Sequence, residues 1–111
     1  MIDLEHLYAM MDSLVVPYLF ADTNHTIQYI NKPGLAWYAK FGGAALIGQS
    51  LLACHNEKSV ATIEEILEAF KNGEDERIYE DSARRRSYMT AVRAKDGRLL
   101  GYYERFEPPA D

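Results

Sequence analysis

The alternation of apolar and polar residues divides the chain into helical and strand-like segments. Residues 3–13 carry apolar side chains at the spacing of an amphipathic helix, namely Leu4, Leu7, Tyr8 and Met11. Asp3 is placed to cap this helix at its N-terminus. The strongest helical pattern spans residues 56–72, with Asn56 as its expected cap and Gly73 after its end. Its apolar stripe consists of Val60, Ile63, Ile66, Leu67 and Phe70.

Five other segments have the β-branched and aromatic composition of strands. The first two cover residues 14–21 and 26–30 and are joined by a turn, and residues 31–43 form a loop with short helical turns. Pro17 cannot donate a ladder hydrogen bond, so it places the first strand at a sheet edge or marks where that strand begins. The other three cover residues 76–81, 87–94 and 98–106, with a hairpin predicted at Lys95-Asp96-Gly97.

This order of elements predicts an α+β fold, in which a five-stranded antiparallel sheet has the helices on one face and an N-terminal flanking helix. We expect the flanking helix at residues 1–13, a single domain at residues 14–107 and a tail at residues 108–111. The 111 residues are enough for one domain, and a composition with 48% hydrophobic and 26% charged residues argues against disorder.

Charge and cysteine content narrow the class of protein. A net charge of −5 argues against nucleic-acid binding, which needs a basic face. The longest apolar run, residues 14–21, is far shorter than the roughly 20 residues of a membrane span, so no membrane contact is expected. The single cysteine, Cys54, excludes an internal disulfide and fits a reducing compartment. We therefore expect a cytoplasmic protein.

Several local patterns resemble those of the PAS domain family. Residues 17–31 read as strand, acidic turn, strand and asparagine, Gly48 precedes the long helix, and residues 91–104 resemble the closing hairpin of the family. The segment Cys54-His55-Asn56-Glu57-Lys58-Ser59 resembles a subgroup with the signature Cys-His-Pro-Pro-x-Ser before the long helix, although both prolines are absent. The resemblance covers residues 14–107 and implies a PAS-like sheet with helices on one face.

What the resemblance implies is a sensory or interaction domain without catalytic activity, which binds a small molecule or cofactor between sheet and helices, or nothing at all. The residues expected to line such a pocket are Tyr29, Trp37, Leu52, Cys54, His55, Ile63, Leu67, Tyr88, Val92 and Tyr102. A structural dimerisation domain with no ligand, whose aromatic side chains fill the core, is an alternative.

The apolar stripe of residues 3–13 either packs on its own sheet or pairs across a homodimer assisted by the sheet, and we favour the homodimer. Signalling would then use self-association or a separate signalling protein.

Cys54-His55 is the dipeptide in the chain that is best suited to cofactor binding or catalysis. Non-covalent haem is the leading specific cofactor, with His55 as the axial ligand of a gas or redox sensor. The covalent haem motif is not met, because Leu51 occupies the position of its first cysteine. In the alternative interpretation His55 caps the long helix or bonds to nearby backbone, and Cys54 is a small buried apolar residue. A catalytic Cys/His pair would also need an orienting group, and no such group is recognisable.

Two other sets of residues favour ordinary roles. The three histidines, His6, His25 and His55, are too far apart in sequence for a zinc site, and we expect His25 to be solvated in a hairpin turn. Arg84-Arg85-Arg86 is expected to be a charged connection between strands, with acidic residues nearby in sequence, in preference to a phosphate site.

Overall fold

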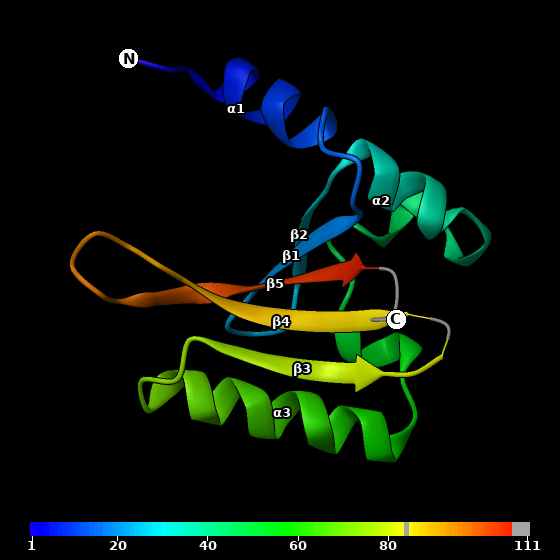
Figure 1. Cartoon of the computed structure of the whole chain (residues 1–111), viewed down its shortest axis with the longest axis vertical. Helices are drawn as coiled ribbons and strands as arrows, with labels where there is room; N and C mark the ends of the chain where they lie inside the picture. Colours follow the sequence, from blue (N-terminus) through cyan, green and yellow to red (C-terminus); the bar gives the residue numbers. More distant parts are fainter. Residues whose placement is uncertain (84, 108–111) are drawn as a thin grey trace.

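The chain folds into a five-stranded antiparallel sheet with helices packed against it, as shown by a computed structural model that describes residues 1–83 and 85–107 (Figure 1). The side chain of Cys54 also lies outside this description. The strand order is β2-β1-β5-β4-β3, which confirms the predicted fold class. The strands are β1 (Tyr18–Asp22), β2 (Ile27–Ile30), β3 (Glu76–Asp81), β4 (Arg86–Arg93) and β5 (Leu99–Glu107).

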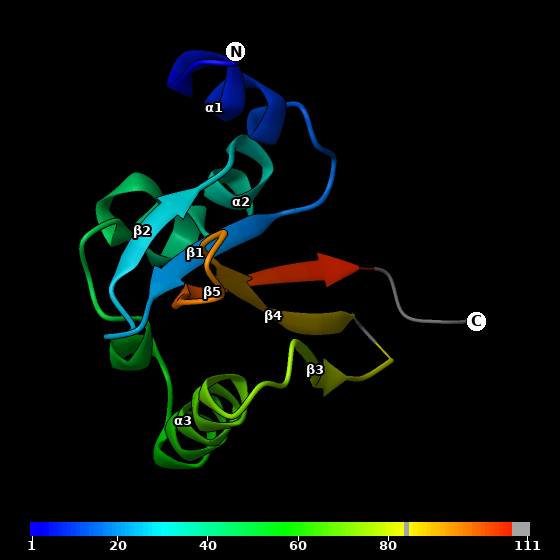
Figure 2. The same cartoon turned by 90° about the vertical axis from the view of Figure 1, so that its left-hand side faces the viewer.

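The helices differ in which side of the sheet they cover. They are α1 (Leu4–Asp12), α2 (Lys32–Trp37), α3 (Glu57–Lys71) and the short 3₁₀ helices η1 (Ala39–Phe41), η2 (Gly43–Leu46) and η3 (Leu51–Cys54). All except α1 pack on the inner face of the sheet, which is the face that carries the core. Figure 2 shows α1 at one end of the molecule, far from α3. The Tyr8 ring of α1 stacks on Tyr29 of β2 with centroids 5.2 Å apart, on the outer face of the sheet.

The first strand begins later than the apolar run. We predicted a strand over residues 14–21, but residues 14–17 are not in the sheet and β1 starts at Tyr18. Pro17 explains the difference, because it has no N–H to give to the ladder, so the strand can begin only after it. Val15 is 91% exposed as a result. The alternative that Pro17 marks the beginning of the strand is therefore confirmed.

The long helix α3 follows its sequence pattern closely. The Asn56 side chain accepts a hydrogen bond from the Ser59 amide at 2.9 Å, so the predicted cap is confirmed. Gly73, with φ of 103°, follows the end of the helix in a conformation that favours glycine. Ile63, Ile66, Leu67 and Phe70 are buried, and the acidic positions between them face solvent. Burial of this apolar stripe against the sheet holds the helix in place.

The central strand β5 has a different set of side chains on each face. Tyr102, Glu104 and Phe106 are buried on the inner face, and the residues between them point to the outer face. Gly101 is required where β5 passes β1, because a Cβ at that position would lie 2.1 Å from the Ala21 carbonyl oxygen. Glycine thus permits the close pairing that brings the first and last strands together at the middle of the sheet.

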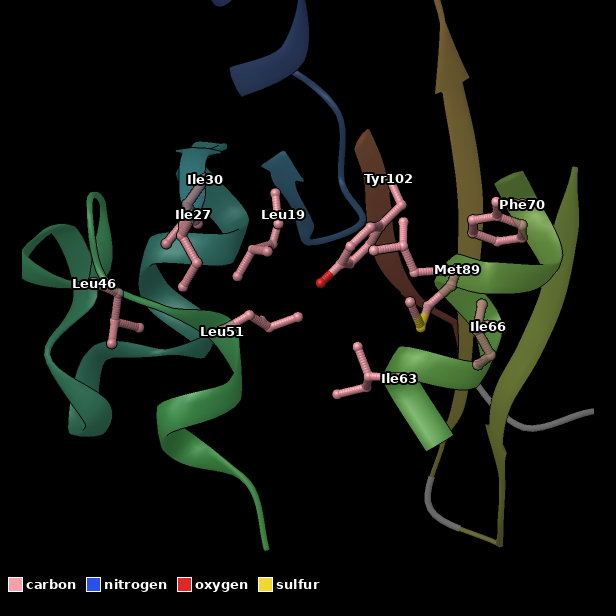
Figure 3. Packing of buried hydrophobic residues seen from close by; sticks show 12 residues of the cluster. Leu19, Ile27, Ile30, Leu46, Leu51, Ile63, Ile66, Phe70, Met89 and Tyr102 are labelled. Atoms are coloured by element: carbon pink, nitrogen blue, oxygen red, sulfur yellow. The ribbon is translucent and has the colours of Figure 1, made fainter. Parts of the chain in front are cut away.

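The core fills only part of the space between sheet and helices. Figure 3 shows Leu46 and Leu51 on one side and Ile66 and Phe70 on the other, with Tyr102 between them. All these residues are buried. The close packing around α3 gives way to a more open arrangement at the short helices, which is where a cavity forms.

Asn31 connects three parts of the fold with one fully buried side chain. Its Oδ1 accepts hydrogen bonds from the amides of Tyr18 and Gly34 at 2.9 and 3.0 Å. Its Nδ2 donates to the carbonyl oxygens of Met11 at 2.9 Å and Val16 at 3.1 Å. The same amide group therefore begins β1, caps α2 and holds the C-terminal end of α1.

Candidate functional site

A cavity of about 720 Å³ lies between the inner face of the sheet and the short helices. This volume falls within the range of about 300–1,000 Å³ that is usual for small-molecule sites. The sheet contributes Leu19, Ile27, Tyr79, Glu80, Glu104 and Phe106. The helical side and the following loop contribute Trp37, Tyr38, Lys40, Phe41, Leu46, Leu51 and His55. Arg85, from the connection between β3 and β4, completes the lining.

Aromatic rings and a guanidinium group form one wall of the cavity. Trp37 stacks on Phe106 with ring centroids 5.2 Å apart. The Arg85 guanidinium lies over both rings, 5.4 Å from the centre of Trp37 and 4.9 Å from the centre of Phe106. Its Nε donates to Glu80 Oε1 at 3.0 Å. Arg85 therefore has both an aromatic and a carboxylate partner.

Glu104 is a buried carboxyl group in the lining of this cavity. The residue is 4% exposed, and its Oε1 has no hydrogen-bond partner among the described residues. Burial raises the pKa of the Glu104 carboxyl to about 7, and the positive charge of Arg85 limits the rise. A buried polar atom without a partner costs free energy, so it is rare in a native fold and calls for an explanation.

His55 presents one ring nitrogen to the protein backbone. Its Nδ1–H donates to the Leu51 carbonyl oxygen at 2.8 Å, which leaves Nε2 of the neutral ring with a lone pair. Nε2 makes no hydrogen bond to any residue in the described part of the chain. The edge of the ring faces Tyr79, with centroids 6.4 Å apart. This arrangement combines the backbone hydrogen bond of our second interpretation with a free nitrogen that a metal could take.

His25 is buried, which corrects our expectation that it is solvated. The residue is 8% exposed and has a positive φ of 64° in the turn between β1 and β2. Its Nδ1 lies 2.8 Å from the Tyr102 hydroxyl oxygen, so the two groups share a hydrogen bond. Burial lowers the pKa of His25 and raises that of Tyr102. The left-handed backbone conformation of His25 turns its ring inward. The turn-forming composition of this segment does not predict that conformation.

The structure brings some of the predicted pocket residues together and separates others. Trp37 and His55 line the cavity. Four residues belong to the core or pack against it, namely Leu52, Ile63, Leu67 and Tyr102. The side chains of Tyr29, Tyr88 and Val92 lie on the outer face of the sheet, because each is next on its strand to a residue of the inner face, namely Ile30, Met89 and Ala91. The backbone of Cys54 ends η3, and its side chain lies outside the description.

Sequence reasoning missed the charged members of the lining, Glu104, Glu80, Arg85 and Lys40. A signal for Glu104 was present, because it alternates with Tyr102 and Phe106 on one strand and therefore shares their buried face. No comparable pattern marks Arg85, whose position depends on how the connection between β3 and β4 folds over the sheet.

The remaining candidates give no further site. Among the described residues, no group of three His, Cys, Asp or Glu side chains is arranged to hold a metal ion. Arg84 lies outside the described residues, and Arg86 pairs with Asp81 at 3.3 Å. In the described part of the chain, no helix is long and apolar enough to cross a membrane.

Comparisons with known proteins agree with this geometry. A family model for the PAS domain matches residues 7–107. A C-terminal domain from Streptococcus mutans is 19% identical over 96% of this chain and 85% of its own, with a TM-score of 0.77. A PAS domain from Colwellia psychrerythraea is 13% identical over 95% of both chains, with a TM-score of 0.71. The Aer2 receptor of Vibrio cholerae, a dual PAS-haem oxygen sensor, is 17% identical over 82% of this chain and 91% of its own, with a TM-score of 0.58. No curated protein matches the chain.

Proposed function

Because this chain belongs to the PAS domain family, we propose that it is a sensory domain that binds a small molecule or cofactor and signals through dimer or partner contacts. The cavity of about 720 Å³ is the observation that carries this proposal. It combines apolar walls with a few polar side chains, which is the usual make-up of a ligand site. A ligand that favours one of two conformations of the domain would then shift the balance between them.

The exposed N-terminal helix supports the part of the proposal that concerns dimer contacts. None of the α1 residues is buried, and its apolar side chains Leu4, Leu7, Tyr8 and Met10 are all exposed. The helix is nevertheless attached to the domain, since the Tyr29 hydroxyl donates to Asp12 Oδ1 at 2.8 Å. A helix of nine residues does not make a stable pair of helices alone, so we propose a homodimer contact in which α1 and the outer face of the sheet act together.

We expect Leu7→Asp to lower the mass measured by light scattering from that of a dimer to that of a monomer. The charge would have to be buried in the proposed helix contact, which is unfavourable. Leu100→Asp is a matched control, because Leu7 is 39% and Leu100 is 40% exposed and Leu100 lies near the far hairpin. An unchanged mass for a folded Leu7→Asp variant would exclude this contact.

A second candidate function is haem-based sensing, and the free Nε2 of His55 favours it. Because Nδ1 is held by the Leu51 carbonyl, Nε2 is the nitrogen that would ligate the iron. Among the described residues, Lys40 and Arg85 are the cations of the lining, and the acidic groups of haem would have to draw Arg85 from its ion pair with Glu80. Haem bound there would supply an iron centre for a gas or an electron.

We expect hemin to give a Soret band with the purified domain, and the band to shift or disappear in His55→Ala. The variant removes the only histidine that lines the cavity in the described structure. His6→Ala serves as the control, because His6 is exposed on α1 and lies outside the cavity. A visible absorption spectrum of hemin that the wild-type protein leaves unchanged would rule haem out and leave a colourless ligand or a ligand-free dimerisation domain.

A further inference from the structure

The inner face of the sheet carries two buried polar atoms that no described residue satisfies, Glu104 Oε1 and Ser87 Oγ. They belong to neighbouring strands, because Ser87 pairs with Phe106 and Met89 with Glu104. Glu104 lines the cavity, and solvent does not reach its Oε1 in this conformation, so a molecule in the cavity contacts this oxygen once the side chain turns toward it. A bare carboxylate oxygen accepts hydrogen bonds and cannot donate one, so a partner for it must carry an N–H or O–H group.

The cations that the chain itself places near the cavity have other partners. Arg85 Nε donates to Glu80 at 3.0 Å, and the guanidinium lies over Trp37 and Phe106. The Lys40 ammonium lies 5.7 Å from the centre of the Phe41 ring. Neither side chain makes a hydrogen bond to Glu104. The lining therefore holds a buried carboxyl group to which neither cation donates a hydrogen bond, among aromatic rings that already attract positive charge.

From these contacts we infer that the cavity takes a small apolar ligand with a protonated amine, and that Glu104 is the residue that binds the amine. The inference rests on the proposed function, since it assigns a ligand class to the same cavity. The ammonium would give Glu104 Oε1 the donor and the positive charge that it lacks. The apolar part of the ligand would lie against Leu19, Ile27, Leu46 and Leu51, which form the aliphatic side of the lining.

Three probes of one shape test the assignment, namely phenethylamine, phenethyl alcohol and hydrocinnamate, which end in a cation, a neutral hydroxyl and an anion. Fluorescence of Trp37, the only tryptophan, reports binding because its ring lies in the cavity wall. We expect phenethylamine to bind about tenfold more tightly than the alcohol, and Glu104→Gln to abolish this preference. Gln keeps the size and shape of the side chain, so the variant is expected to fold.

Glu64→Gln is the matched control, because Glu64 is exposed on α3 and the same charge is removed outside the cavity. It is expected to leave the preference for the amine unchanged. Equal binding of alcohol and amine, tighter binding of hydrocinnamate, or an amine preference that survives in Glu104→Gln would overturn the amine assignment while the cavity remains a ligand site. If none of the probes changes the fluorescence at millimolar concentration, the ligand site itself is contradicted, and with it the proposed function.

Discussion

Replacing Glu104 by glutamine is expected to stabilise the domain by about 3 kcal/mol at about pH 8 and to change it little at about pH 5. The reason is that burial raises the pKa of this carboxyl from 4.5 to about 7. Between pH 4.5 and about pH 7, the Glu104 carboxyl of the folded protein holds a proton that the unfolded chain has released. The stability that Glu104 contributes is therefore complete below pH 4.5 and is lost as the pH rises to about 7.

Thermal unfolding at several pH values measures this effect. At about pH 8 the melting temperature of Glu104→Gln should exceed that of the wild-type domain by about 10 °C, and the difference should shrink as the pH falls. The other titratable groups of the lining are the same in both proteins, so the comparison isolates Glu104; these groups are Tyr38, Lys40, His55, Tyr79, Glu80 and Arg85. The exposed Glu64→Gln should stay within about 0.5 kcal/mol of the wild type at every pH. If the difference in melting temperature between Glu104→Gln and the wild type did not depend on pH, folding would leave the pKa of this carboxyl unchanged, and the prediction would be wrong.

The second large effect is expected for Asn31→Asp, which should destabilise the domain by about 3 kcal/mol. The carboxylate can still accept the hydrogen bonds from Tyr18 and Gly34, but it has no donor for the carbonyl oxygens of Met11 and Val16. Two partly buried carbonyl groups would then face a negative charge. Because the Met11 carbonyl belongs to α1, we also expect the α1 amides to lose protection from hydrogen exchange.

Urea unfolding followed by circular dichroism gives the stability difference for Asn31→Asp. The control is Asn24→Asp, the same substitution at an exposed position in the turn between β1 and β2, with an expected change within about 0.5 kcal/mol. A similar small change for both variants would mean that the four hydrogen bonds of Asn31 contribute little to the fold.

The parts of the fold that could be predicted are those that depend on neighbours in sequence. The caps Asp3 and Asn56 accept hydrogen bonds from amides three residues later, so each can be recognised within one helical turn. The hairpin at residues 95–97 is similar, since the Gly97 amide donates to the Ala94 carbonyl oxygen at 2.9 Å. In each case the partner atoms are fixed by local geometry.

The parts that could not be predicted depend on contacts between distant segments. Tyr88 lies on the outer face, where the Arg105 guanidinium is 4.0 Å from its ring centre, and its neighbour Met89 is buried. A shift of one residue in the pairing of β4 and β5 would exchange these two positions, and both residues are apolar enough for either face. The cavity lining is the same kind of problem, because it combines residues from most elements of the chain.

The central position of β5 has a consequence for how the state of the cavity can be detected elsewhere. Phe106 and Glu104 line the cavity, and Arg105 between them ion-pairs with Glu76 at 3.0 Å on the outer face. Side chains that follow one another on a strand project from a single backbone on opposite sides, about 3.3 Å apart along the chain. If a ligand displaced the inner pair, we would expect Arg105 to move with it, because all three side chains project from the same stretch of backbone. The Arg105–Glu76 ion pair is therefore the place on the outer face where a change in the cavity would first be detectable.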